Sequence, residues 1–189
     1  MYCRAVQADR RRASHTCLRQ FDEPALGIRH IRVQTDFASP KHGTELVSYR
    51  NEPAANRPDD AALGAVIPRA GAQGFATFPR PLGNMAVGTV TKVGSAVACF
   101  AIGDRLFGHF PIRETHTVDQ THADLMPDGL PSEVAVSLDR AIMALAMRDA
   151  EITLGNHVAI FGTGAIGLIA VQRARLAGAD RVIAIHPIA

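Results

Sequence analysis

The chain has 189 residues, of which 47% are hydrophobic and 20% are charged, and this composition is typical of a protein that buries a core. At this length we expect one or two domains. The formal net charge of +2 is too small to indicate a nucleic-acid-binding protein.

The cysteines and the N-terminus indicate the cellular compartment. Cys3, Cys17 and Cys99 lie far apart and form no C-x-x-C pair, so they predict no disulfide framework and favour a reducing compartment. The N-terminus has no apolar stretch of the kind found in secretory signals, and no segment is suited to spanning a membrane. We therefore expect a cytoplasmic protein without membrane or nucleic-acid partners.

The first 150 residues carry the signals of a β-rich domain. Residues 31–37 alternate between apolar and polar side chains, which is typical of a half-buried strand. Residues 87–93 and 105–107 predict further strands, and the proline-rich stretch 51–81 predicts loop. Residues 133–150 repeat apolar side chains at helical spacing and predict a helix.

Two polar features in this part predict no binding site. The basic run 10–12 is short and is best interpreted as a solvated loop or strand end. His109, His116 and His122 lie in a polar stretch without metal-ligand spacing. We expect these three histidines to be exposed.

A G-x-G-x-x-G turn stands near the C-terminus, between a predicted strand and a predicted helix. The apolar run 158–160 precedes its glycines, and residues 165–177 have the pattern of a helix. Gly162 permits a sharp turn, Gly164 lets the backbone approach a diphosphate, and Gly167 lets the helix pack closely on the strand. The pattern therefore predicts a dinucleotide-binding turn.

The start of this helix is the candidate cofactor-binding surface. Its first residues, Ala165 and Ile166 among them, offer unpaired N–H groups and the positive end of the helix dipole to an anion. Residues 181–186 predict the strand that follows the helix. Together these elements form one β-α-β unit over about residues 156–187.

One β-α-β unit is about a third of a dinucleotide-binding domain, which needs two βαβαβ halves. The two strands are apolar nearly throughout, as strands buried on both faces are, and alone they would expose an unpaired edge. Either the chain is a truncated form of a longer protein or another chain covers the edge, and we favour truncation. Self-association into a homo-oligomer is compatible with either interpretation.

Four stretches in the right order resemble the medium-chain dehydrogenase/reductase superfamily, the relatives of the zinc-type alcohol dehydrogenases. His42-Gly43-Thr44-Glu45 is similar to the family's Cys-Gly-Thr-Asp, and residues 81–90 are similar to its Pro-x-Leu-Gly-His-Glu-x-x-Gly-x-Val. Residues 93–106 are similar to its Val-Gly-x-x-Val and Phe-x-x-Gly-Asp-Arg-Val. The fourth stretch is the glycine turn with its flanking strands.

The resemblance implies a mixed β and α/β fold. It predicts a GroES-like β-barrel catalytic domain over residues 1–150, followed by an incomplete NAD(P)-binding Rossmann domain, a β-α-β unit, over residues 151–189. In this family the active site lies in the cleft between the two domains. There a hydride passes between the substrate carbon and nicotinamide.

The zinc-ligand positions of the family hold other residue types here. His42 stands at the thiolate position, and Asn84-Met85 replaces the His-Glu pair. Amides and thioethers are poor zinc ligands, and the scattered cysteines cannot supply a four-cysteine structural zinc lobe. We therefore expect no bound metal, while a site rebuilt from His42, Asp139 and Glu45 is the alternative.

The resemblance also implies candidate catalytic residues, because several branches of the superfamily work without metal. In those branches the coenzyme and a hydrogen-bonding side chain stabilise the developing oxyanion. Thr44 occupies the position of the hydroxyl that relays the substrate proton, or it only caps the turn after Gly43. His42 is a candidate proton carrier, or it only fills the former ligand pocket.

His186 is the candidate for coenzyme selection. It ends the second strand of the unit, where the fold normally has an Asp or Glu that binds the ribose hydroxyls and favours NAD. An imidazole cannot act there as an anion, and a protonated one would favour the 2′-phosphate of NADP. We therefore expect NAD or NADP with a slight preference for NADP, unless the position changed because the coenzyme no longer binds.

The sequence thus predicts an NAD(P)-dependent oxidoreductase, zinc-independent, that transfers hydride between nicotinamide and a small alcohol, carbonyl or enone substrate. The alternative is a non-catalytic GroES-like relative, or an inactive fragment acting through protein contacts. The nicotinamide half of the site is missing from these 189 residues. Because positioning supplies much of a hydride-transfer rate, we expect the isolated chain to be poorly active or inactive.

Overall fold

The computed structural model describes residues 2–8, 15–50, 59–60, 65–66 and 80–187. The chain divides into two compact units, Met1–Val136 and Ser137–Ala189. The sequence placed the boundary between residues 150 and 151, and that assignment of domains stays a prediction. The predicted loop 51–81 lies mostly outside the described residues, and the basic run 10–12 lies wholly outside them.

The elements of each unit follow in chain order. The first unit contains β1 (Tyr2–Ala8), β2 (Thr16–Asp22), β3 (His30–Ser39), α1 (His42–Tyr49), β4 (Asp59–Asp60), β5 (Ala65–Val66), β6 (Arg80–Pro81), β7 (Met85–Val93), β8 (Arg105–Gly108), β9 (Thr115–Asp119), η2 (Gln120–His122), β10 (Asp124–Leu125) and α2 (Ser132–Ala135). The second unit contains α3 (Leu138–Leu145), η3 (Ala146–Ala150), β11 (His157–Phe161), α4 (Ala165–Leu176) and β12 (Arg181–Ile185).

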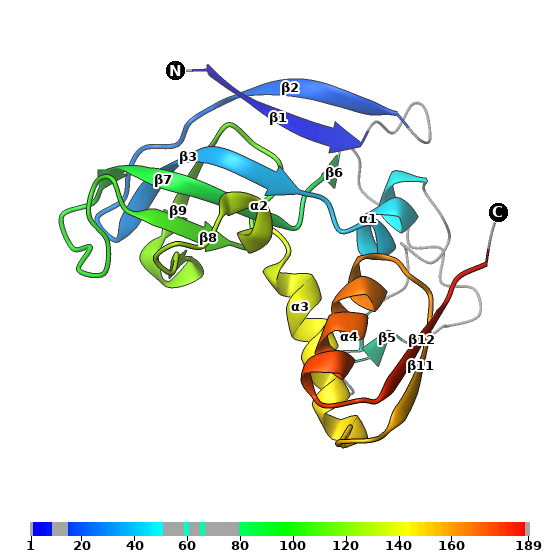
Figure 1. Ribbon diagram of the computed structural model, residues 1–189. Helices are drawn as coiled ribbons and strands as arrows, with labels where there is room; N and C mark the ends of the chain where they lie inside the picture. Colours follow the sequence, from blue (N-terminus) through cyan, green and yellow to red (C-terminus); the bar gives the residue numbers. More distant parts are fainter. Residues whose placement is uncertain (1, 9–14, 51–58, 61–64, 67–79, 188–189) are drawn as a thin grey trace. The chain divides into compact units, whose positions relative to one another are not determined.

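An antiparallel sheet in the order β10-β8-β7-β3-β9 forms the centre of the first unit (Figure 1). The strands predicted at residues 31–37, 87–93 and 105–107 are confirmed as β3, β7 and β8. In the described part of the chain β9 and β10 are the two edges of this sheet. The described strands therefore form an open sheet and do not close into a barrel.

The alternation that predicted β3 also places the core. Ile31 and Val33 are 0% and 1% exposed, whereas Gln34 and Asp36 face solvent. Complete burial of such an aliphatic side chain contributes roughly 1.5–3 kcal/mol. The buried cluster that contains them draws on β3, β7, β8 and the loops beside β8, and it consists of Ile31, Val33, Ala86, Val90, Phe100, Leu106 and Phe110.

A smaller sheet in the order β2-β1-β6 was not predicted from the sequence. Its strand β1 buries Cys3, Ala5 and Ala8. Small side chains give a weak hydrophobic signal, so the pairing depends on the partner strand and on the bridge between Ala5 and Arg113. The local pairing of β1 with β2 forms a hairpin, and the contacts of β1 with β6 and with Arg113 come from distant parts of the sequence.

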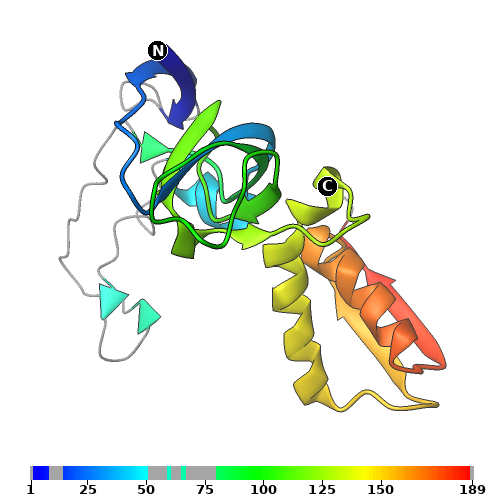
Figure 2. The same cartoon turned by 90° about the vertical axis from the view of Figure 1, so that its left-hand side faces the viewer.

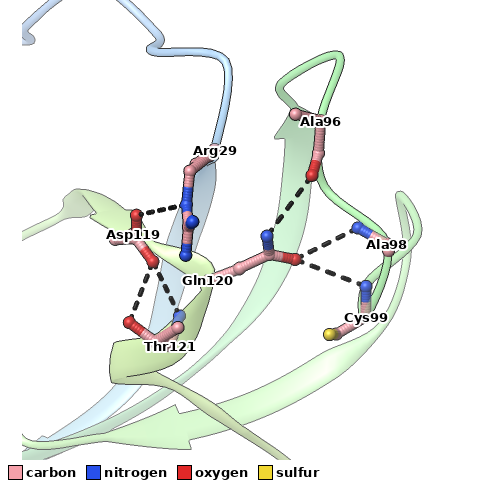
Figure 3. Close-up of polar contacts among 7 residues, drawn as sticks. All are labelled: Arg29, Ala96, Ala98, Cys99, Asp119, Gln120 and Thr121. Carbon is pink, nitrogen blue, oxygen red and sulfur yellow. Dashed lines mark hydrogen bonds and ion pairs between the residues drawn. The ribbon is translucent and has the colours of Figure 1, made fainter.

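The turn after β9 is joined to the loop after β7 through one side chain (Figure 3). The Gln120 Oε1 atom accepts hydrogen bonds from the backbone N–H groups of Ala98 and Cys99, and its Nε2 donates to the carbonyl oxygen of Ala96. Beside it, Asp119 accepts hydrogen bonds from the backbone N–H and the hydroxyl of Thr121, which hold the pKa of Asp119 below its usual range. The result is a fixed edge for the central sheet.

The prediction of one continuous helix over residues 133–150 is wrong. The chain forms α2, α3 and η3 instead, because Ser137 has φ −101° and ψ 0° and interrupts the helical path. A short 3-10 turn is a common way to end a helix, and here it ends at Glu151, a non-glycine residue in the left-handed conformation with φ 47°. The apolar periodicity was present, but it did not reveal these breaks.

The second unit has the predicted β-α-β order. Strands β11 and β12 pair in parallel, α4 connects them, and α3 lies beside α4 (Figure 2). Val158 and Ile160 are half-buried on one face, whereas Ala159 and Phe161 on the other face are exposed, Phe161 by 79%. Among the described residues, no helix is both long and apolar enough to cross a membrane.

Candidate functional site

The glycine turn joins β11 to α4 in the conformation that the sequence predicts. Gly162 has φ +91°, a left-handed backbone that L side chains rarely adopt, and its N–H donates to the carbonyl oxygen of Ile185 at 2.7 Å. The turn thus extends the pairing of β11 with β12 by one hydrogen bond. Gly164 is the N-cap of α4 and supplies no side-chain cap.

The space around the three glycines differs. A Cβ atom added at Gly164 would meet no atom within 4 Å, so the backbone there is open to a ligand. A Cβ atom added at Gly167 would lie 1.8 Å from the carbonyl oxygen of Gly162, so only glycine fits where the helix crosses the turn. The first-turn N–H groups of an α-helix have no intrahelical partner. The start of α4 can therefore present them to an anion.

His186 contacts this turn directly. The Thr163 backbone N–H donates to Nδ1 of His186 at 3.3 Å. In a neutral ring whose Nδ1 accepts, the proton is on Nε2, so the remaining nitrogen is a donor. His186 is exposed at the end of β12, and it can donate a hydrogen bond to an oxygen of a bound ligand.

The catalytic candidates of the first unit lie on α1. His42 begins this helix and is exposed, and Thr44 lies directly after Gly43 in its first turn. The sequence predicted no helix here. The Thr44 side chain lies outside the described residues, so its role as a proton relay stays a prediction, as does the role of His42.

Two of the residues at the family's metal positions, Asn84 and Met85, are poor zinc ligands. Asn84 offers an amide and Met85 a thioether, and Met85 is 3% exposed. Both carboxylate oxygens of Glu45 already accept backbone hydrogen bonds. Among the described residues, no three His, Cys, Asp or Glu side chains gather in a way that could hold a metal ion. Asp139 belongs to the second unit, so a site shared with His42 stays a prediction.

His116 corrects one of the predictions. The sequence predicted an exposed histidine, but this side chain is 4% exposed and its ring stacks on that of Phe110 at 4.9 Å between centroids. Burial, together with the nearby charge of Arg113, lowers the pKa of His116 to about 4. His109 and His122 are exposed, as predicted.

Glu45 has a structural role that the sequence did not indicate. The sequence favoured it only as a replacement metal ligand, whereas it joins the start of α1 to Gly83. The matching Asp of the family motif could have drawn attention to this position. No sequence pattern, however, indicated that its partner would be a backbone N–H that lies 38 residues away.

The comparisons with known proteins agree with this geometry. No family model matches the chain. It is 35% identical over 177 residues to D-guloside 3-dehydrogenase of Escherichia coli (strain K12), a match that covers 90% of this chain and 51% of that protein. The chain therefore spans about half the length of this relative, and about half the length of the D-guloside 3-dehydrogenase of Shigella flexneri.

Solved structures show the same fold at lower identity. A protein of Sinorhizobium meliloti 1021 that is described as a zinc-binding dehydrogenase and was solved with bound NADP has a TM-score of 0.70 and 22% identity, over 97% of this chain and 56% of that one. The 2R,3R-butanediol dehydrogenase of Bacillus subtilis has a TM-score of 0.71 and 19% identity, over 98% of this chain and 63% of that one. The curated homologues are dehydrogenases and the structural neighbours have the same fold, so the predicted resemblance to the medium-chain dehydrogenase/reductase superfamily, the relatives of the zinc-type alcohol dehydrogenases, is confirmed.

Proposed function

We propose that this chain is part of an NAD(P)-dependent oxidoreductase and that its glycine turn binds the coenzyme diphosphate. The observation that carries the proposal is the open backbone at Gly164, which stands directly before the positive end of α4. The left-handed Gly162 and the tightly packed Gly167 support it, because each has the role expected in a dinucleotide turn.

The chain's own residues would bind and orient the coenzyme. The N–H groups of Ala165 and Ile166 would donate to the diphosphate oxygens, and Nε2 of His186 would donate to an oxygen near the adenosine ribose. The bound nicotinamide supplies the hydride chemistry. The fold normally has a carboxylate at this position, which would repel the 2′-phosphate of NADP. The hydrogen-bond donor of His186 instead supports the slight preference for NADP.

We also propose that the reaction needs no zinc. Asn84 and Met85 at the metal positions are poor ligands, so polarisation of the substrate oxygen would depend on hydrogen bonds. Thr44 and His42 are the proposed proton carriers. The relatives named for a D-guloside and for butanediol favour a small alcohol that carries more than one hydroxyl group as the substrate. The separated free cysteines favour the cytoplasm as the location.

Titration of the ¹⁵N-labelled chain with NADP⁺ and NAD⁺, followed by NMR, tests the coenzyme site. We expect weak binding, with Kd roughly 0.1–1 mM, and shifts concentrated at the amides of residues 162–167. Gly164→Ala should weaken binding about tenfold or more, because its methyl group takes the space of the diphosphate. Gly43→Ala adds a methyl group in similarly open space on α1 and should leave binding unchanged.

The same titration separates the proposal from its alternative. His42 and Asn84-Met85, in place of zinc ligands, favour a non-catalytic relative that acts through protein contacts. Absence of shifts at the turn with millimolar coenzyme would support that alternative. His186→Asp should shift the preference towards NAD⁺, and an unchanged ratio of the two affinities would remove His186 from the site.

A further inference from the structure

The Glu45 carboxylate connects two segments of the first unit that are distant in the sequence. The Lys41 backbone N–H donates to Oε1 at 2.5 Å, and the Gly83 backbone N–H donates to Oε2 at 2.6 Å. Both contacts are partly buried and short, as expected when the acceptor is charged. One side chain therefore satisfies a donor at the start of α1 and a donor in the loop between β6 and β7.

The Gly83 end of this connection has little freedom to move. Gly83 has φ +114°, and a Cβ atom there would lie 2.4 Å from the backbone nitrogen of Ile112. The preceding residue, Leu82, donates its N–H to the carbonyl oxygen of Val6 and accepts from the N–H of Ile112. The following residue, Asn84, donates its N–H to the carbonyl oxygen of Ser39. The loop is thus a fixed point, and Glu45 attaches α1 to it.

One of the segments that Glu45 connects carries the candidate catalytic residues, and the other occupies the position of the family's His-Glu pair. His42 and Thr44 lie on α1 immediately before Glu45, and Asn84 and Met85 follow Gly83. A change in the distance between Glu45 and Gly83 would therefore change the distance between these two sets of residues. An enzyme site loses rate when its groups are misplaced by as little as about 1 Å.

We infer that Glu45 is a positioning residue, which sets the spacing between the His42–Thr44 segment and the Asn84–Met85 segment without itself touching substrate. Its importance for turnover rests on the proposed function. The chemistry is specific to glutamate, because a carboxylate has two acceptor oxygens whereas an amide has one acceptor and one donor. Glu45→Gln therefore leaves one of the two N–H groups facing another donor. Glu45→Asp keeps the charge but is one methylene shorter, so it reaches only one of the two groups.

Amide hydrogen exchange, measured by NMR on the whole 189-residue chain, tests the inference. In Glu45→Gln we expect exchange at Gly83 or Lys41 to accelerate about tenfold or more. In Glu45→Asp one of these amides should stay protected while the other exchanges faster. The core amide of Val90, which donates to the carbonyl oxygen of Asp104, should be unchanged in both variants and shows that the unit is folded. Glu133→Gln, an exposed carboxylate on α2, is the matched control and should change neither amide.

Kinetics distinguish positioning from a general loss of stability. Because the isolated chain is expected to be poorly active, the readout is its residual oxidation of 2R,3R-butanediol, the alcohol in the name of one structural neighbour. Glu45→Gln should lower this residual kcat/KM by roughly 10- to 100-fold while the Kd for NADP⁺ stays unchanged. Unaltered exchange at both Gly83 and Lys41 in Glu45→Gln would overturn the inference, and so would an equal loss of coenzyme affinity. If the wild-type chain binds no coenzyme, the proposed function fails, while the exchange rates still decide whether Glu45 holds the two segments together.

Discussion

Replacing His116 by phenylalanine is expected to remove much of the acid sensitivity of the first unit. The ring lies on β9 opposite Val33, it is 4% exposed, and its Nε2 has no hydrogen-bond partner among the described residues. Burial and the Arg113 charge both disfavour the imidazolium, which lowers the pKa of His116 to about 4 in the folded protein. A histidine in an unfolded chain titrates near 6.5.

The sign of the pH dependence follows from these two pKa values. Above about pH 6.5 the imidazole is neutral in both states, so His116 contributes no pH dependence. Between 6.5 and about 4 the unfolded chain binds a proton that the folded chain excludes, so stability falls as the pH falls. This gap corresponds to a loss of roughly 3 kcal/mol, which is complete once the pH is below the pKa of the folded state.

Urea unfolding followed by circular dichroism at about pH 7.5 and about pH 4.5 measures this loss. Phenylalanine keeps the ring against Phe110 and removes the unpaired nitrogen, so His116→Phe should be as stable as the wild type near neutrality. At the acidic pH the variant should be more stable than the wild type by about 2–3 kcal/mol. His109→Phe, at an exposed position, should show the wild-type pH dependence. An identical loss of stability on acidification in wild type and His116→Phe would refute the reasoning.

Three further substitutions test other parts of the structure. Gly167→Ala should destabilise the second unit by roughly 1–3 kcal/mol, since its Cβ would overlap the carbonyl oxygen of Gly162. Gly164→Ala should unfold at the wild-type temperature. Equal melting temperatures of the two variants would contradict the tight packing at Gly167. Glu151→Gly should raise the melting temperature, because it relieves a left-handed residue at a cost of about 1 kcal/mol, and an unchanged or lower value would argue against that conformation. Glu23→Gln should lower the free energy of unfolding by roughly 3 kcal/mol, because the Glu23 side chain is 5% exposed and pairs with Arg32 at 3.2 Å. Urea unfolding measures this loss, and a change below about 0.5 kcal/mol would show that the ion pair contributes little.

The elements that the sequence predicted well are those with local signals. The glycine turn is readable because Gly162 adopts a left-handed backbone and Gly167 packs against the carbonyl oxygen of Gly162, both within a few residues. The alternation around Ile31 and Val33 likewise follows from the pleat of a single strand. In both cases the physical cause lies inside the segment that shows the pattern.

The features that escaped prediction depend on distant partners. His116 looked polar in its neighbourhood, yet it is buried where β9 pairs with β3 opposite Val33, which is distant in the sequence. Strand β1 has only small buried side chains, and Glu45 bonds to Gly83 across 38 positions. Local periodicity contains no information on such contacts. For the first unit the sequence therefore named candidate site residues, but it did not predict how they are arranged in space.

The glycine turn also has a consequence for the order in which the chain folds. All the hydrogen bonds that shape it, from Gly162 to Ile185 and from Thr163 to His186, close loops of fewer than 25 residues. The central sheet instead depends on pairings such as that of Arg32 with Thr117, which are 85 positions apart. Since closing a short loop costs less entropy and local contacts form faster, the glycine turn is expected to be in place before the large sheet is complete.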